Sequence, residues 1–96
     1  PAAVPLYPGA EALAAAGIRS TIHAANLAHA PVRGAQGARG ALLHDPQTAG
    51  GLLAALPQEA AGVILSRLAH EGIPAHRIGR MVAGAPGIDC RAGAAD

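Results

Sequence analysis

The clearest hydrophobic pattern in the chain lies in residues 58–71, QEAAGVILSRLAHE. Apolar residues recur there at spacings of three and four, which places an apolar stripe on one helical face: Ala61, Ile64 or Leu65, Leu68 and Ala69. Gly72 follows, where glycine closes a helix in the left-handed conformation, and Pro74 lies just beyond. The pattern therefore predicts a helix over residues 58–71.

Two short apolar runs flank this helix, at residues 52–56 and 76–82. Each has the length of a strand, and a helix that joins two strands implies a parallel pair with a right-handed connection. We therefore predict a β-α-β unit at about residues 52–82, with a further short strand in GIDCR after the Pro86-Gly87 turn. The fold class is α/β, or α+β.

The N-terminal part predicts two short helices and a loop. Residues 8–18, PGAEALAAAGI, have Pro8 near the first turn, Glu11 at the positive helix end and Gly17 as the closing residue. A second helix is expected between a Ser20 or Thr21 cap and Pro31.

Residues 32–40, VRGAQGARG, have three glycines and no apolar run, so we predict a mobile loop there. ALLHD, residues 41–45, is again strand-sized, and AGAAD, residues 92–96, is typical of a frayed tail.

Composition limits the function classes. The chain has 96 residues, enough for one small domain, and 51% of them are hydrophobic although Phe and Trp are absent. An aromatic-poor core carries little area per residue, so we expect apolar surface that a partner covers. The net charge of +1 without a basic stripe favours neither nucleic acid nor membranes as partners. One cysteine fits a reducing cytoplasm, and the initial Pro1 suggests an excised fragment.

Candidate chemistry lies in residues 45–51, DPQTAGG. Asp45 and Pro46 favour a turn, while the bare amides of Gly50 and Gly51, with the Thr48 hydroxyl, can approach an anion. No lysine follows, so this is not a Walker-type loop, and on spacing alone a purely structural glycine-rich turn is the stronger interpretation.

The remaining reactive side chains form no recognisable motif. Cys90 has no base near it in sequence. The histidines lack the spacing that aligns two metal ligands on a helix, so we expect surface or boundary positions and no metal site: His23, His29, His44, His70 and His76.

A resemblance takes the argument further. DPQTAGGLL, residues 45–53, closely resembles the DPQTSGGLL signature in the C-terminal domain of selenophosphate synthetase (selenide, water dikinase), with Ala49 where that family usually has Ser. Residues 8–26, PGAEALAAAGIRSTIHAAN, resemble the family's stretch before the motif, and residues 72–82, GIPAHRIGRMV, resemble the strand after the crossover helix. The three blocks occur in family order over nearly the whole chain.

The resemblance implies a role within a larger enzyme. This family makes selenophosphate, AMP and phosphate from selenide, ATP and water with magnesium, and it shares the two-domain architecture of aminoimidazole ribonucleotide synthetase. Its N-terminal domain carries most ATP-binding and metal-binding acids, and a glycine-rich segment carries a reactive cysteine or selenocysteine and a lysine. None of these matches residues 1–96. The resemblance thus implies an incomplete C-terminal domain, a mixed sheet with packed helices, which lacks the N-terminal ATP-binding domain, forms a homodimer and is inactive alone.

By this resemblance the chain contributes one wall of the nucleotide and phosphate cleft, with no catalytic residue, no metal ligand and no tightly bound cofactor of its own. Thr48, Gly50 and Gly51 are the best binding candidates. Weaker candidates are Asp45, Gln47, Asn26, Arg33 and Arg39. Asp45 and Asn26 can instead hold a turn and a helix terminus. Two alternatives stay open: a non-catalytic binding or interaction module, and a related ATP-dependent synthetase with another acceptor.

Overall fold

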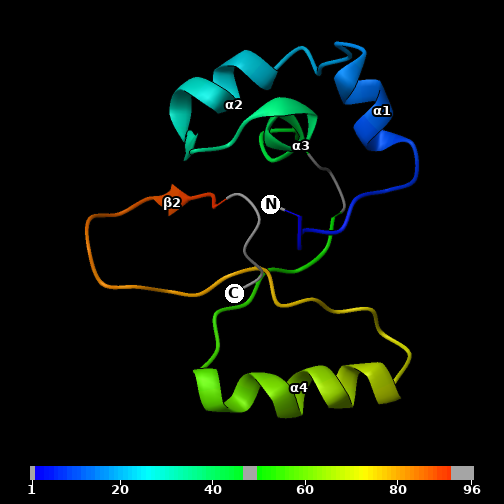
Figure 1. Ribbon diagram of the computed structural model, residues 1–96, viewed down its shortest axis with the longest axis vertical. Helices are drawn as coiled ribbons and strands as arrows, with labels where there is room; N and C mark the ends of the chain where they lie inside the picture. The colour runs from blue at the N-terminus through cyan, green and yellow to red at the C-terminus, as the bar shows by residue number, and fades with distance from the viewer. Residues whose placement is uncertain (1, 47–49, 92–96) are drawn as a thin grey trace.

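The computed structural model describes residues 2–46 and 50–91 and contains short helices and a small parallel sheet (Figure 1). Its elements, in chain order, are α1 (Ala10–Ala15), α2 (His23–His29), β1 (Val32–Arg33), α3 (Gly37–Leu42), α4 (Gln58–His70) and β2 (Ile88–Asp89). The fold is thus mixed α/β, as the sequence predicted.

The helices α1 and α4 are closed as predicted, each by a glycine that directly follows the C-cap residue. Gly17 has φ 91°, its amide donates to the Ala14 carbonyl at 3.0 Å, and the next amide, of Ile18, donates to the Leu13 carbonyl at 3.1 Å. After α4, Gly72 has φ 74°, its amide donates to the Ala69 carbonyl at 3.0 Å, and the Ile73 amide donates to the Leu68 carbonyl at 2.9 Å. Both pairs of bonds form the Schellman motif, in which a left-handed residue lets the chain turn back and satisfy the last carbonyls.

The predicted second helix is confirmed as α2. The predicted Ser20 or Thr21 cap is wrong, because the N-cap residue is Ile22 and no side chain caps the helix. Ser20 Oγ instead accepts a hydrogen bond from the Ile22 amide at 3.2 Å, in the turn that leads into α2. The helix ends at His29, and Pro31 lies just beyond its C-cap residue, Ala30.

The strands predicted at residues 52–56 and 76–82 are wrong. Neither segment is a strand, and the parallel pair is β1 with β2, in which Val32 lies opposite Ile88 and Arg33 opposite Asp89. Leu52 is 103% exposed and Val82 is 74% exposed, so neither run buries a face. Because strand preference depends mainly on packing of a half-buried surface, length and apolar character alone do not make these runs strands. The last predicted strand, in GIDCR, is confirmed as β2.

The loop predicted at residues 32–40 is also wrong, because it contains β1 and the first part of α3. Gly40 is buried within α3, and a Cβ added there would lie 2.7 Å from the carbonyl carbon of Ala35. This glycine permits a close approach of two backbone segments and does not mark a flexible loop. The apolar run that follows likewise completes α3 at Leu42 and forms no strand.

Burial is concentrated where α1 packs against α3. Within the described residues, Ala14 of α1 is the one buried apolar residue, at 2% exposure. The helix α4 lies apart from α1, α2 and α3, on the opposite side of the molecule (Figure 1). Four residues of its predicted stripe are half-buried and one, Ala69, is exposed: Ala61, Ile64, Leu65, Leu68 and Ala69.

Large apolar side chains are exposed along the segments that flank α4. They include Leu52, Leu53, Met81 and Val82, and Ile88 of β2 is exposed as well. Exposed apolar surface is what the aromatic-poor composition predicted. No helix in the described part of the chain combines the length and apolar character that a membrane crossing requires.

Candidate functional site

The glycine motif lies between α3 and α4, and the structure describes its two ends. Gln47 and Thr48 lie outside the described residues. Gly50 and Gly51 are both exposed, and among the described residues no atom other than those of its chain neighbours lies within 4 Å of a Cβ built on Gly51. Gly51 also lacks a positive φ, so its backbone conformation does not require glycine. What the missing side chain provides at Gly51 is unobstructed access to the backbone.

The N-terminal end of the motif is held by His44, which directly precedes Asp45. His44 is only 7% exposed, and its Nε2 accepts a hydrogen bond from the Val32 amide at 3.0 Å. Its Nδ1 lies 2.9 Å from the Gly40 carbonyl oxygen. Since a carbonyl only accepts and an amide N–H only donates, the ring is neutral, with its proton on Nδ1. The imidazole therefore joins α3 to the start of β1.

The expectation that every histidine occupies a surface or boundary position is wrong for His44. Its ring meets that of His23 edge to face, with centroids 6.2 Å apart and an interplanar angle of 83°. The Nδ1 atom of His23 is buried and has no hydrogen-bond partner among the described residues. The sequence held one indication that His44 is buried, because this residue directly follows two leucines. No local pattern predicts its partners on α2 and β1.

Asn26, a weaker binding candidate, has a partner within the fold. Its side-chain Nδ2 donates to the His44 carbonyl at 3.0 Å, which ties α2 to the chain just after α3. The alternative role of Asn26 was expected from a bond to nearby backbone, whereas this partner lies 18 residues away. Asp45 itself is exposed, and its backbone amide donates to the Leu42 carbonyl at 3.1 Å, which continues the turn after α3.

Arg39 uses its guanidinium to fasten the N-terminal segment. Its Nη1 lies 3.3 Å from Glu11 Oε2 on α1, and its Nη2 donates to the carbonyls of Ala2 and Val4 at 3.2 and 3.0 Å. These contacts join α3, α1 and the chain before α1. The structure therefore gives this candidate a structural role.

Arg33 is engaged in the β1–β2 pair. Its Nε and Nη2 donate to the two carboxylate oxygens of Asp89 at 2.6 and 3.1 Å, and this bidentate contact joins residues that are opposite in register. The hydrogen bond and charge of Asp89 raise the pKa of Arg33. The pKa of Asp89 is lowered, first by the hydrogen bonds from Arg33 and then by the charges of Arg33 and Arg91.

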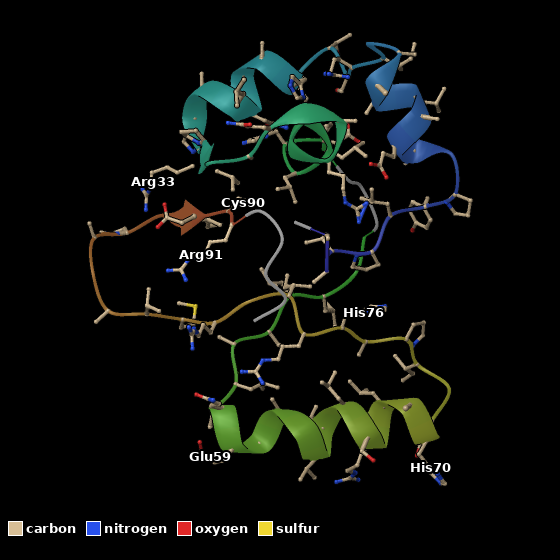
Figure 2. All side chains as sticks on the ribbon, viewed as in Figure 1. Arg33, Glu59, His70, His76, Cys90 and Arg91 are labelled. Atoms are coloured by element: carbon tan, nitrogen blue, oxygen red, sulfur yellow. The ribbon has the colours of Figure 1, made fainter. Side chains whose placement is uncertain are left out.

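Arg33, Cys90 and Arg91 gather around β2, whereas Glu59 and His70 lie near the two ends of α4 (Figure 2). Cys90 is half-buried, and its backbone amide donates to the Arg33 carbonyl at 2.7 Å. In the ranges 2–46 and 50–91, no group of three or more His, Cys, Asp or Glu side chains is placed to hold a metal ion.

Comparison with known proteins identifies a relative of this chain. The chain is 40% identical over 93 residues to selenide, water dikinase from Pseudomonas straminea, and the alignment covers 91% of this chain. The chain therefore contains a selenophosphate synthetase-related region. The alignment covers 26% of the relative, so the chain spans about a quarter of that protein's length. No family model and no solved structure matches the chain.

Proposed function

We propose that the chain is a fragment of the C-terminal domain of a selenophosphate synthetase-like enzyme, and that it contributes one wall of the nucleotide and phosphate cleft. The parent reaction converts ATP, selenide and water into selenophosphate, AMP and phosphate. The match to selenide, water dikinase supports the origin of the region. The assignment of the cleft wall rests on the open backbone at Gly51. The conformation of this position does not require glycine.

In this proposal Gly50 and Gly51 present backbone N–H groups to a phosphate, and Thr48 adds a hydroxyl. No described residue accepts a hydrogen bond from the Gly50 or Gly51 amide. Backbone amides without a side chain above them bind anions by converging several N–H dipoles on one oxygen group. Asp45 and Gln47 remain weaker candidates. Asn26, Arg33 and Arg39 are better explained by their bonds within the fold.

The chain alone is proposed to be inactive. Phosphoryl transfer requires metal ions and basic groups that position the phosphates and neutralise their charge. ATP and magnesium are assigned to the N-terminal ATP-binding domain of the parent enzyme, which is also the proposed partner, with a homodimer as the proposed assembly.

Phosphate titration of the isotope-labelled chain tests the anion-facing loop. We expect the amide signals of Thr48, Gly50 and Gly51 to shift together, with a dissociation constant of about 1 mM, or about −4 kcal/mol, since a solvated site without a metal binds weakly. Gly51→Ala is expected to weaken binding because its Cβ obstructs the backbone. Gly62→Ala, on an exposed position of α4, is the matched control. Amides that stay unchanged at high phosphate would leave the glycines with a structural role only.

A coupled assay for selenide-dependent ATP consumption tests the inactivity of the chain. We expect no turnover above the rate without protein, because the reactive cysteine and lysine of the family have no counterpart in residues 1–96. Addition of an N-terminal ATP-binding domain from a related enzyme is the positive arm of the assay. Turnover by the chain alone would contradict the proposal.

A second candidate function is a non-catalytic interaction module. The exposed apolar side chains on both sides of α4, such as Leu53 and Met81, favour it, because surface of this kind normally meets a partner. An unchanged phosphate titration together with stable self-association would favour this candidate over the cleft wall.

A further inference from the structure

We propose that His44 is a positioning residue, which acts with Asn26 to fix the direction in which the glycine motif leaves α3. The inference rests on the proposed function, since what is positioned is the loop that would face the phosphate. Neither residue is proposed to touch the anion. Both act through the backbone of Asp45.

The peptide unit between His44 and Asp45 is held at both of its polar ends. Its carbonyl oxygen accepts from Asn26 Nδ2 at 3.0 Å, and its N–H, which belongs to Asp45, donates to the Leu42 carbonyl at 3.1 Å. A peptide unit is planar, so two hydrogen bonds on opposite edges set the orientation of its plane. The direction of the chain at Asp45 is thereby determined from α2 and α3 together.

The His44 ring holds the same junction from a third direction. Its two nitrogens contact the Gly40 carbonyl within α3 and the Val32 amide at the start of β1, at 2.9 and 3.0 Å. His44 is the buried polar residue of the described chain. A leucine of similar size would leave the Val32 amide and the Gly40 carbonyl without this partner, and an unsatisfied buried polar group is costly. The histidine is therefore needed for its two nitrogens and not only for its volume.

Beyond this junction the described chain has no comparable anchor before α4. Asp45 and Pro46 are exposed, and so are all residues from Gly50 to Gln58. Pro46 has no N–H and restricts its own φ, which limits the conformations of the chain directly after Asp45. The His44 junction is thus the fixed point from which the motif extends.

The test uses the 96-residue chain with three variants and one control. Asn26→Asp removes the donor to the His44 carbonyl with almost no change in size, and it leaves both bonds of the His44 ring. His44→Leu removes the ring nitrogens, and His44→Gln restores one donor and one acceptor. His29→Leu, at an exposed position of α2, is the control. Amide spectra and inorganic phosphate titrations are recorded for each protein.

Without phosphate, Asn26→Asp and His44→Leu are expected to shift the amides of Asp45, Gly50 and Gly51 and to leave those of α4 unchanged. The dissociation constant of each variant for phosphate is expected to be about fivefold higher than that of the unsubstituted chain, because each variant loses about one net hydrogen bond. His44→Gln should recover most of both effects, whereas a residue that served packing alone would not be rescued by its amide. The control should match the unsubstituted chain.

The outcomes separate the two proposals. If the unsubstituted chain does not bind phosphate, the proposed function fails, and the amide shifts without phosphate still decide the positioning role. If Asn26→Asp leaves the Asp45 and Gly51 amides unshifted, positioning is overturned even when phosphate binds. Should His44→Leu lose the signals of α1 and α3 by unfolding, Asn26→Asp and His44→Gln carry the test alone.

Discussion

Replacement of Gly34 by alanine is the sharpest test of the β1–β2 pair. Gly34 directly follows β1 and has φ 76°, in the left-handed region that disfavours side chains. A Cβ added there would lie 2.6 Å from the carbonyl oxygen of Cys90, which is backbone and cannot rotate away. The substitution therefore combines an unfavourable conformation with a steric conflict between the two strands.

The expected magnitude comes from three contributions. Alanine in the left-handed conformation costs about 1–2 kcal/mol. Alanine also lowers the conformational entropy of the unfolded chain, which offsets about 0.4–1 kcal/mol of this cost. Moving the Cys90 carbonyl also breaks the hydrogen bond from the Cys90 amide to the Arg33 carbonyl, 2.7 Å long, which is worth about 1 kcal/mol. The sum predicts that Gly34→Ala favours opening of the pair by about 2 kcal/mol, or about 30-fold.

Amide hydrogen exchange at Cys90 measures this opening directly. Gly72→Ala is the matched control, because Gly72 is also left-handed, with φ 74°, but no described atom beyond its chain neighbours lies within 4 Å of the added Cβ. It should leave Cys90 unchanged and speed exchange at Ile73, whose amide closes α4, by about fivefold, which corresponds to about 1 kcal/mol. Cys90 exchange in Gly34→Ala that equals exchange in the unsubstituted chain would refute the steric argument.

Two further predictions concern the ion pair and the exposed apolar surface. Because the pKa of Asp89 is lowered in the folded chain, its contribution to β1–β2 stability is present above the pKa of the unfolded carboxyl and is lost as the pH falls through the lowered folded value. Cys90 amide protection should fall in that acidic range and lose this dependence in Asp89→Asn; an identical pH profile in the variant would contradict the assignment. The chain should also self-associate in solution, and Leu52→Asp should shift it toward the monomer, because Leu52 is 103% exposed. Light scattering that gives a monomer mass at high concentration would exclude this.

Signals confined to a few neighbouring residues predicted α1, α2 and α4, whereas α3 was missed. The ends of α1 and α4 follow from Gly17 and Gly72, because a Schellman motif involves only residues within one turn of the glycine. The apolar stripe of α4 was likewise predicted from apolar residues that recur at spacings of three and four. The glycine motif stood out because six turn-favouring or small residues lie between two apolar runs, and the same residues resemble the selenophosphate synthetase signature.

The strands and the polar junction depended on contacts between distant segments. Val32 and Asn26 reach His44 across 12 and 18 residues, and Arg33 reaches Asp89 across 56. Gly40 was mistaken for a loop glycine because only its packing against Ala35 reveals why a side chain is excluded. A helix end satisfies its own hydrogen bonds locally, so a short stretch of sequence specifies it. A strand or a buried imidazole is stabilised only when a remote backbone supplies the partner, and only the folded chain determines which backbone that is.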